Sequence, residues 1–336
     1  APTPAAQALH GGKELNLGVL LLNLGGPESQ EDVEPFLYNL FADPDIIRLP
    51  RLLQWLQAPI AKIISARRAP KSKSAYASIG GGSPIVPWTN AQAVAIGDEL
   101  CAKGMRGAKC YVAMRYWYPF TEDALREIEN DGVNALVIIP LYPQFSISTS
   151  GSSLRVLNKE FTSRPEKWGP KQVVHTVVPS WYDRPGYVNA VANLVAKEVN
   201  QFTHQQMEEG IQVLFSAHGV PKSYIEAGDP YKSQIEACVE LISRQTSNIL
   251  GSSHQGSKST TGGGVSYHLS YQSRVGPVEW LQPYTDSMIN DLAKGGCKNL
   301  VVVPVSFVSE HIETLEEIDM EYRELAEEAG VANWRR

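Results

Sequence analysis

Three strand-and-turn segments occur twice along this chain, in the same order in each half, and this repetition constrains the fold more than any other feature. Each segment is a short apolar run that contains or ends in Gly or Pro, as buried strands of parallel sheets do. The order predicts an α/β protein with two halves of similar plan, joined near residues 180–185. The pairs are residues 17–27 with 213–221, 111–119 with 268–277, and 136–143 with 300–307.

Helical patterns lie between the expected strands, and residues 36–73 differ from the rest of the chain in composition. Helices are expected at 28–39, 89–103 and 121–131. Residues 36–73 combine apolar clusters around Trp55 with a basic end. This composition suits a helical hairpin on a membrane surface or at the lip of an apolar pocket. Core helices of the first domain would explain it equally well.

Composition excludes several classes of protein. A chain of 336 residues is long enough for two domains, and its net charge of −6 argues against nucleic acid as a partner. Its four cysteines are far apart, which fits neither a disulfide framework nor a cysteine-rich metal site. No apolar run is long enough to span a membrane. Residues 1–12 are small and polar, and are compatible with the remnant of a removed targeting segment.

Two glycine-rich turns are candidate places for close approach by a ligand. Asn23–Pro27 follows the first strand, although such a turn is more often only a tight turn. Residues 76–84 contain three glycines before Ser83, which would leave backbone N–H groups for an anion. The GK[ST] sequence of a phosphate loop is absent, so a nucleotide site is not predicted.

Polar residues gather at or just after the ends of the expected strands. Parallel sheets bind ligands beyond the carboxyl ends of their strands, and domain interfaces host pockets. We therefore expect these residues to face one cleft. They are Arg115, Tyr116, Gln144, Ser146, His218, Glu310, His311 and Glu313.

An acidic run follows the last strand of the repeat. We expect Ser309 to cap a helix in which Glu313, Glu317 and Glu321 share one face, four residues apart. Such a face is solvated, relays protons or holds a cation. His218, in a turn after a strand, is either structural or a base or metal ligand. With His311 and Glu313 it would form a nitrogen and oxygen set for iron, zinc or manganese, although the spacing is not that of HExxH.

At these residues the chain resembles the ferrochelatases, most closely their plant and cyanobacterial branch. The matching segments span nearly the whole chain, in family order. They are LLNLGGP at 21–27, YASIGGGSP at 76–84, MRYWYPFTEDAL at 114–125, LYPQFSISTSGSS at 141–153, FSAHGVP at 215–221, QSRVGPVEWLQPYTD at 272–286 and PVSFVSEHIETLEEIDMEY at 304–322.

The resemblance implies a chelatase-like fold of two Rossmann-like domains, 13–180 and 181–336, with a ligand cleft between them and an apolar lip at 36–73. It implies a lyase that inserts ferrous iron into protoporphyrin IX, the last step of haem synthesis. His218 would take pyrrole protons or bind metal, and Glu313 would be its partner across the porphyrin. The proton or metal path would use His311, Glu310, Glu317 and Glu321. Substrate-binding residues would be Arg68, Tyr76, Ser83, Arg115, Tyr116, Trp280 and Leu24.

The chain departs from the family pattern at several places. Tyr118 replaces a histidine of the family's RYxHP motif, and residues 251–264 form a Ser/Gly-rich insert that we expect to be a surface loop. Family members continue beyond residue 336 into a final helix, so the second domain is expected to be truncated. The cysteines of an iron–sulfur cluster have no counterpart, and no tightly bound cofactor is expected.

Three functions remain open from the sequence. The first is a protoporphyrin ferrochelatase, and the second is a chelatase of the same fold that uses coproporphyrin or another metal. The third is an inactive protein that binds a tetrapyrrole. Similarity to the plant branch implies a plastid protein on a peripheral membrane surface, and the alternative is the cyanobacterial cytoplasm or membrane surface.

Overall fold

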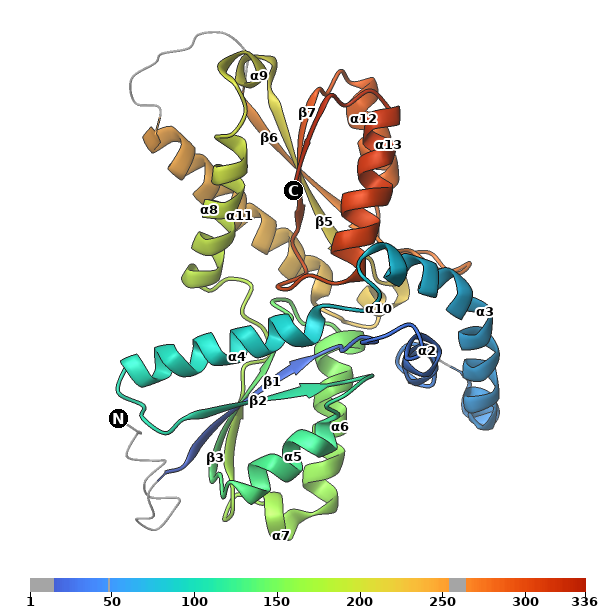
Figure 1. The fold of residues 1–336 in the computed structure, drawn as a ribbon, viewed down its shortest axis with the longest axis vertical. Helices are drawn as coiled ribbons and strands as arrows, with labels where there is room; N and C mark the ends of the chain where they lie inside the picture. The colour runs from blue at the N-terminus through green and yellow to red at the C-terminus, as the bar shows by residue number, and fades with distance from the viewer. Residues whose placement is uncertain (1–14, 48, 254–263) are drawn as a thin grey trace. The chain divides into compact units, whose positions relative to one another are not determined.

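The computed structural model describes residues 15–47, 49–253 and 264–336 (Figure 1). Residues 1–12, and all but the ends of the insert at 251–264, lie outside the described residues. The chain divides into two compact units. The first runs to Ser180 and includes Ser309–His311, and the second comprises Trp181–Val308 and Ile312–Arg336.

The first unit is a four-stranded sheet in the order β2-β1-β3-β4, with every neighbouring pair parallel. Its strands are β1 (Leu17–Asn23), β2 (Lys109–Met114), β3 (Ala135–Pro140) and β4 (Val174–Val177). Its helices are α2 (Val33–Phe41), α3 (Gln57–Ser78), α4 (Ile85–Ala102), α5 (Thr121–Asn130), α6 (Ser152–Ser163) and α7 (Pro165–Trp168). A 3₁₀ helix, Arg51–Leu56, precedes α3, and a π-helix, Ile147–Gly151, precedes α6.

The second unit repeats this plan with the order β6-β5-β7-β8, again all parallel. Its strands are β5 (Ile211–His218), β6 (Val265–Gln272), β7 (Asn299–Pro304) and β8 (Asn333–Arg335). Its helices are α8 (Pro185–Val199), α9 (His204–Glu209), α10 (Lys222–Glu226), α11 (Tyr231–Ser253), α12 (Thr285–Lys294) and α13 (Arg323–Glu328), with a π-helix, Glu313–Tyr322, before α13. The predicted α/β class with two parallel sheets is confirmed.

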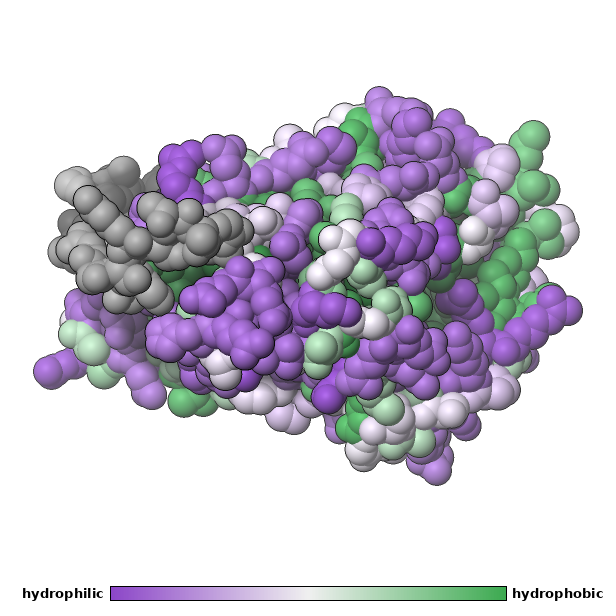
Figure 2. All heavy atoms as spheres, turned by 90° about the horizontal axis from the view of Figure 1, so that it is seen from above, coloured by the Kyte–Doolittle hydropathy of each residue, from purple (hydrophilic) through white to green (hydrophobic). Residues whose placement is uncertain are grey.

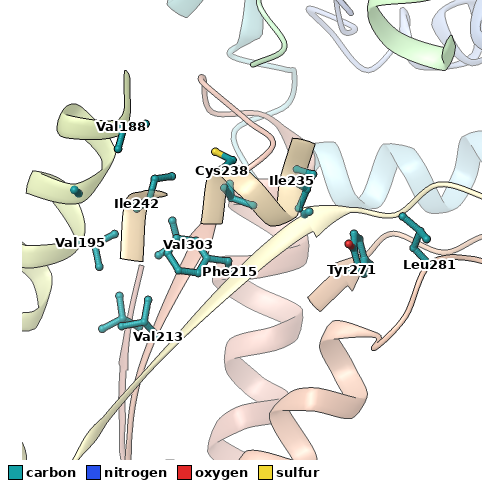
Figure 3. Packing of buried hydrophobic residues seen from close by; sticks show 14 of the residues in the cluster. Val188, Val195, Val213, Phe215, Ile235, Cys238, Ile242, Tyr271, Leu281 and Val303 are labelled. Carbon is teal, nitrogen blue, oxygen red and sulfur yellow. The ribbon is translucent and has the colours of Figure 1, made fainter. Parts of the chain in front are cut away.

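Alternation along the strands explains the core of the second unit. Side chains of successive strand residues point to opposite faces of a sheet. Val213 and Phe215 of β5 therefore join the cluster with α8 and α11 that Figure 3 shows, whereas Leu214 joins a separate cluster with α12 and α13. Because both faces are covered, the central strands are apolar throughout, which is the signal that the sequence carries.

Matching hydrogen bonds define how the two repeats align. Leu141 N donates to Leu22 O at 2.7 Å, and Val305 N donates to Ser216 O at 3.1 Å. Counting onward from Leu22 and Ser216, Leu24 is the counterpart of His218. The first unit thus has a leucine at the position where the second unit has a histidine.

One predicted pairing is right for its two strands and wrong for the prolines that end the segments. Met114 N donates to Pro119 O at 2.7 Å, and the equivalent bond in the second unit joins Tyr271 N to Pro283 O at 2.9 Å. Pro119 therefore corresponds to Pro283, and not to Pro277. The loop after β6 is longer than the loop after β2, and a comparison of sequence order alone cannot detect that.

The two glycine-rich turns of the first unit pack against each other. Ser83 N donates to Pro27 O at 2.7 Å, and Gly81 N donates to Tyr76 O at 2.8 Å. A Cβ atom on Gly26 would lie 2.5 Å from the Cβ atom of Ser83. Gly26 is thus needed for the close approach of the Ser83 side chain, and the N–H groups of Gly81 and Ser83 are not left for an anion as the sequence pattern predicted.

Residues 36–73 contain both buried and exposed apolar side chains. Phe36, Leu37 and Phe41 of α2 are buried, as core helices require. Leu52 and Trp55 of the 3₁₀ helix are 89% and 74% exposed. Among the described residues, no helix is both long enough and apolar enough to cross a membrane.

Candidate functional site

His218 is the last residue of β5, at the carboxyl edge of the second sheet. Gly219 follows it, and a Cβ atom at Gly219 would lie 2.9 Å from Gln272 O and 3.2 Å from the Trp280 ring. Only glycine fits between these groups without displacing one of them. The His218 ring has its centroid 6.4 Å from those of Trp280 and Phe307, edge to face, and its side chain remains 35% exposed.

Glu313 begins the π-helix after β7 and bonds the histidine directly. Its Oε2 atom lies 2.7 Å from His218 Nδ1. The prediction that these two residues belong to one site is consistent with this contact. The expectation that a porphyrin lies between them is wrong, because a gap of 2.7 Å has no room for a ring. His218 ends β5 and Glu313 follows the end of β7, the strand paired with it, so both approach from the same edge of the sheet.

A second carboxylate, Glu317, lies behind this pair and is held by four donors. Its Oε1 accepts from Ser273 N at 2.9 Å and from Tyr322 Oη at 2.8 Å. Its Oε2 accepts from Ser273 Oγ at 2.5 Å and from Gln272 Nε2 at 3.2 Å. Ser273 Oγ is also 3.0 Å from Glu313 Oε2. Ser273 adopts a φ of 63°, in the left-handed region that residues other than glycine rarely occupy.

Charge and burial act in opposite directions on the ionisable groups. Burial is the largest influence on the pKa of His218 and lowers it, but the charge and hydrogen bond of Glu313 and the charge of Glu317 together exceed it. The pKa of His218 is therefore raised above its ordinary value of 6.5. Burial, and then repulsion by Glu313, raises the pKa of Glu317 above 4.5.

The other predicted members of the acidic path are less tightly assembled. Glu321 is exposed, and Glu310 and His311 belong to the short stretch that groups with the first unit. Ser309 does not cap the helix, which begins later, at Ile312 and Glu313. Across residues 15–47, 49–253 and 264–336, no three His, Cys, Asp or Glu side chains form a group that would hold a metal ion.

In the first unit, Arg115 and Tyr116 meet around Asp43. Asp43 Oδ2 accepts from Arg115 Nη2 at 2.8 Å, from Tyr116 Oη at 2.7 Å and from Ser152 Oγ at 2.6 Å. Arg115 Nε donates to Ser152 Oγ at 2.7 Å. Tyr116 is fully buried, whereas Arg115 lines an open pocket of about 330 Å³ beside α5. Of the two, Arg115 is therefore the one that a ligand can reach.

The remaining predicted substrate residues differ in how accessible they are. Tyr76 and Ser83 are buried, at 5% and 8% exposure, and so are Gln144 and Ser146. Trp280 is 9% exposed and donates through Nε1 to Val275 O at 2.9 Å. Leu24 is half-buried next to Asn23. Arg68 is exposed on α3, with its guanidinium 5.7 Å from the centre of the Phe41 ring.

Sequence reasoning missed the residues that hold these sites in place. Asp43, Ser152, Ser273 and Tyr231 contact the predicted residues from distant parts of the chain. Asp43 lies within the predicted lip segment, where only the apolar pattern stood out. Ser152 and Ser273 lie within two of the family motifs, at 141–153 and 272–286. Their place in these motifs was the signal in the sequence that could have identified them.

The sequence matches the family model described as Ferrochelatase over residues 16–336. The chain belongs to the ferrochelatase family. It is 56% identical over 321 residues to "Ferrochelatase-2, chloroplastic" of Oryza sativa subsp. indica. The aligned region covers 95% of this chain and 57% of the rice protein. It therefore spans little more than half the length of that relative.

Two further ferrochelatases show how widely the similarity extends. The chain is 55% identical over 337 residues to "Ferrochelatase-1, chloroplastic/mitochondrial" of Arabidopsis thaliana, covering 99% of this chain and 68% of that protein. It is 54% identical over 321 residues to "Ferrochelatase" of Synechocystis, covering 95% of this chain and 77% of that protein. The predicted resemblance to plant and cyanobacterial members of the family is thus confirmed.

Proposed function

We propose that this protein is a lyase that inserts ferrous iron into protoporphyrin IX to form protohaem. The observation that carries the proposal is the direct contact between His218 Nδ1 and Glu313 Oε2, at 2.7 Å, within a chain of the ferrochelatase family. Metal entry must remove two N–H protons from the porphyrin, so the reaction needs a base that can also release protons.

Glu313 determines which nitrogen of His218 can act as that base. A carboxylate at Nδ1 favours the tautomer with its proton on Nδ1, which leaves the lone pair on Nε2. No residue in the described part of the chain bonds Nε2, and the side chain is partly exposed. We therefore infer that Nε2 takes the pyrrole proton, or contacts the incoming iron, while Glu313 stabilises the imidazolium that forms.

Glu317 extends this arrangement away from the histidine. Its raised pKa makes it a better proton acceptor than an ordinary glutamate near neutral pH. We propose that protons leave His218 in the direction of Glu313 and Glu317. Glu310, His311 and the exposed Glu321 would then take part in proton or metal entry at the surface.

Porphyrin binding would use the accessible members of the predicted set. The guanidinium groups of Arg68 and Arg115 suit the two propionates, because arginine pairs with carboxylates through two parallel hydrogen bonds. The half-buried Leu24 would contact the macrocycle, and so would Trp280, which is mostly buried but packs beside the His218 ring. The burial of Tyr76, Ser83 and Tyr116 favours an indirect role, in which they support the walls of the site.

The protein would work at a peripheral membrane surface, with no nucleic acid partner. The exposed apolar residues Leu52, Trp55 and Ile63 lie near the exposed basic residues Lys62 and Arg67 along one segment. Figure 2 shows apolar atoms at the edge of the surface on the side of α3. Apolar and basic groups together favour binding to anionic lipid. The names of the rice and Arabidopsis relatives support a plastid location, and the Synechocystis relative supports a cyanobacterial cytoplasm or membrane surface as the alternative.

We also propose that the reaction needs no tightly bound cofactor and no iron–sulfur cluster, with iron present only as substrate. The cysteines support this proposal, because Cys101 and Cys110 are exposed and half-buried, and Cys238 and Cys297 are buried in apolar clusters. Metal analysis of the purified protein and its visible absorption spectrum would test it, and a stoichiometric iron–sulfur chromophore would contradict it.

Anaerobic incubation with ferrous iron and protoporphyrin IX tests the proposed reaction directly. We expect the porphyrin fluorescence to disappear as protohaem forms. His218→Ala should lower kcat by at least about a hundredfold, because the base is lost. His204→Ala, at an exposed histidine of α9, is the matched control and should retain the wild-type rate.

Other outcomes would replace the proposal with one of the alternatives. Faster insertion with coproporphyrin, or with zinc or cobalt in place of iron, would favour a related chelatase. Porphyrin binding without any insertion would indicate an inactive tetrapyrrole-binding protein. Equal rates for the wild type and His218→Ala would contradict the assigned base.

A further inference from the structure

Three hydrogen bonds form a closed ring around the backbone of His218. Its N–H donates to Ser306 Oγ at 2.9 Å, and its carbonyl accepts from Tyr231 Oη at 2.8 Å. Ser306 and Tyr231 are also hydrogen-bonded to each other through their side chains. Each hydroxyl can thus donate once and accept once within the ring.

The ring exists because the neighbouring strand ends too early. β7 ends at Pro304, and Val305 N makes the last ladder bond, to Ser216 O at 3.1 Å. The backbone groups of His218 therefore extend past their partner strand, and buried backbone groups must be bonded elsewhere. The side chains of Ser306 and Tyr231 replace the missing strand partner.

The side chains of Tyr231 and Ser306 are both buried, and both residues lie in or next to regular elements of the fold. Tyr231 is the first residue of α11, is 5% exposed, and its N–H donates to Asp229 Oδ1 at 3.0 Å. Ser306 is 8% exposed, one residue after the last ladder bond. His218, in contrast, is followed by Gly219, the residue type with the greatest backbone freedom. On the β6 side this strand end is held by the bond from Gly219 N to Gln272 O, at 2.9 Å, and on the β7 side the ring takes the place of the strand.

We propose that Tyr231 and Ser306 are positioning residues that fix the backbone of His218, so that its Nε2 atom faces the substrate while Nδ1 meets Glu313. This inference rests on the proposed function, because it concerns the efficiency of that base. Both residues are buried, so they would act through His218 and not on the substrate directly. Their effect is therefore on kcat, and not on the affinity for porphyrin.

Tyr231→Phe tests the ring, and the second unit offers a matched control. Tyr271 is also a buried tyrosine of the same core, and its hydroxyl has no hydrogen-bond partner among the described residues. We expect Tyr231→Phe to lower kcat about tenfold with the KM for porphyrin unchanged, since one orienting hydrogen bond is lost. Tyr271→Phe removes the same atom without removing a bond and should leave kcat within about twofold of the wild type.

Ser306 provides an independent pair of variants, in case Tyr231→Phe does not fold. Ser306→Ala should lower kcat as Tyr231→Phe does, and Ser306→Thr should restore it because the hydroxyl is kept. Equal kcat values for the wild type, Tyr231→Phe and Ser306→Ala would overturn the proposal. An equal fall in kcat for Tyr231→Phe and Tyr271→Phe would overturn it as well, because it would indicate a general effect on the core.

A spectroscopic measurement separates this proposal from the proposed reaction. With ring-labelled histidine, the His218 signal, assigned by its loss in His218→Ala, should be single and sharp in the wild type. It should broaden or split in Tyr231→Phe and remain sharp in Tyr271→Phe. If the wild type inserts no metal, the proposed function fails, while this signal still decides whether the ring orders His218. An unchanged signal in Tyr231→Phe would contradict the ring.

Discussion

His218 and Glu313 form a pair in which each partner alters the chemistry of the other. The carboxylate is ninety-five residues away in the chain and reaches the imidazole only because β5 and β7 are paired. Burial alone would make His218 a weaker base than free histidine. The nearby negative charges reverse that effect and raise the pKa of His218, which would favour proton uptake in the proposed reaction.

The pKa of His218 can be measured directly by NMR titration of its ring. We expect a value above 6.5 in the wild type, and a lower value in Glu313→Gln, because burial would then act with less opposition from charge. His268, whose pKa burial lowers, is an internal reference in the same unit. A His218 value that is the same in both proteins would contradict the assigned role of Glu313.

The direction of this shift also determines how stability depends on pH. A histidine whose pKa is higher in the folded than in the unfolded state binds its proton more tightly when folded. The stability that this adds is fully present below the unfolded value, about 6.5. It is lost as the pH rises through the raised folded value. The free energy of unfolding that the pair contributes should therefore be larger in mildly acidic than in alkaline solution.

At the scale of elements, a π-helix follows the third strand of each unit. Ile147–Gly151 precedes α6, and Glu313–Tyr322 precedes α13. Hydrogen bonds between residues five apart make such helices costly, and they occur mostly at functional sites. Here they lie beside the two polar clusters, around Asp43 in the first unit and around Glu317 in the second. A pattern based on α-helical spacing does not predict this geometry.

Two glycines of the first unit should respond in opposite ways to the same substitution. Gly97 lies inside α4, and a Cβ atom there would meet nothing within 4 Å. Gly97→Ala should raise the free energy of unfolding by about 0.5–1 kcal/mol, because alanine favours the helix. At Gly82 a Cβ atom would lie 2.3 Å from Glu28 O, so Gly82→Ala should lower it by about 1–3 kcal/mol. Denaturant unfolding measures both, and a loss of stability in Gly97→Ala would contradict the first expectation.

At the scale of the whole molecule, one plan serves two different purposes. The units share strand order and turn geometry, yet Leu24 stands in the first where His218 stands in the second. The first unit has a buried Asp43 that holds Arg115, a group suited to carboxylates. The second has carboxylates that hold a histidine. Under the proposed function, the repeat would provide one site for binding an anion and another for moving protons.

Liposome binding tests the proposed membrane surface on the intact protein. Replacing both Leu52 and Trp55 with serine should weaken cosedimentation with anionic vesicles about tenfold or more, because two exposed apolar side chains no longer enter the lipid. Trp88→Ser is the matched control, since Trp88 is a 50% exposed tryptophan of α4. Equal binding by the wild type and the double variant would assign these residues another role.

The sequence by itself determined the fold class, the repeated plan and the family. These depend on local signals, namely apolar strands, glycine-rich turns and motifs in a fixed order, which are present in the chain before it folds. It also identified His218, Glu313 and Arg115 as candidates, because strand ends are where parallel sheets place their ligands. Glu317 was identified because it shares a helix face with Glu313.

Only the tertiary structure decided how these residues meet. The Nδ1 atom of His218 bonds Glu313 directly, and two hydroxyls from α11 and the loop after β7 hold its backbone. In the first unit, Asp43 likewise accepts a hydrogen bond from Arg115. Such contacts join residues that are tens of positions apart. Their distances follow from strand pairing, helix geometry and loop length, and no local pattern in the sequence records these.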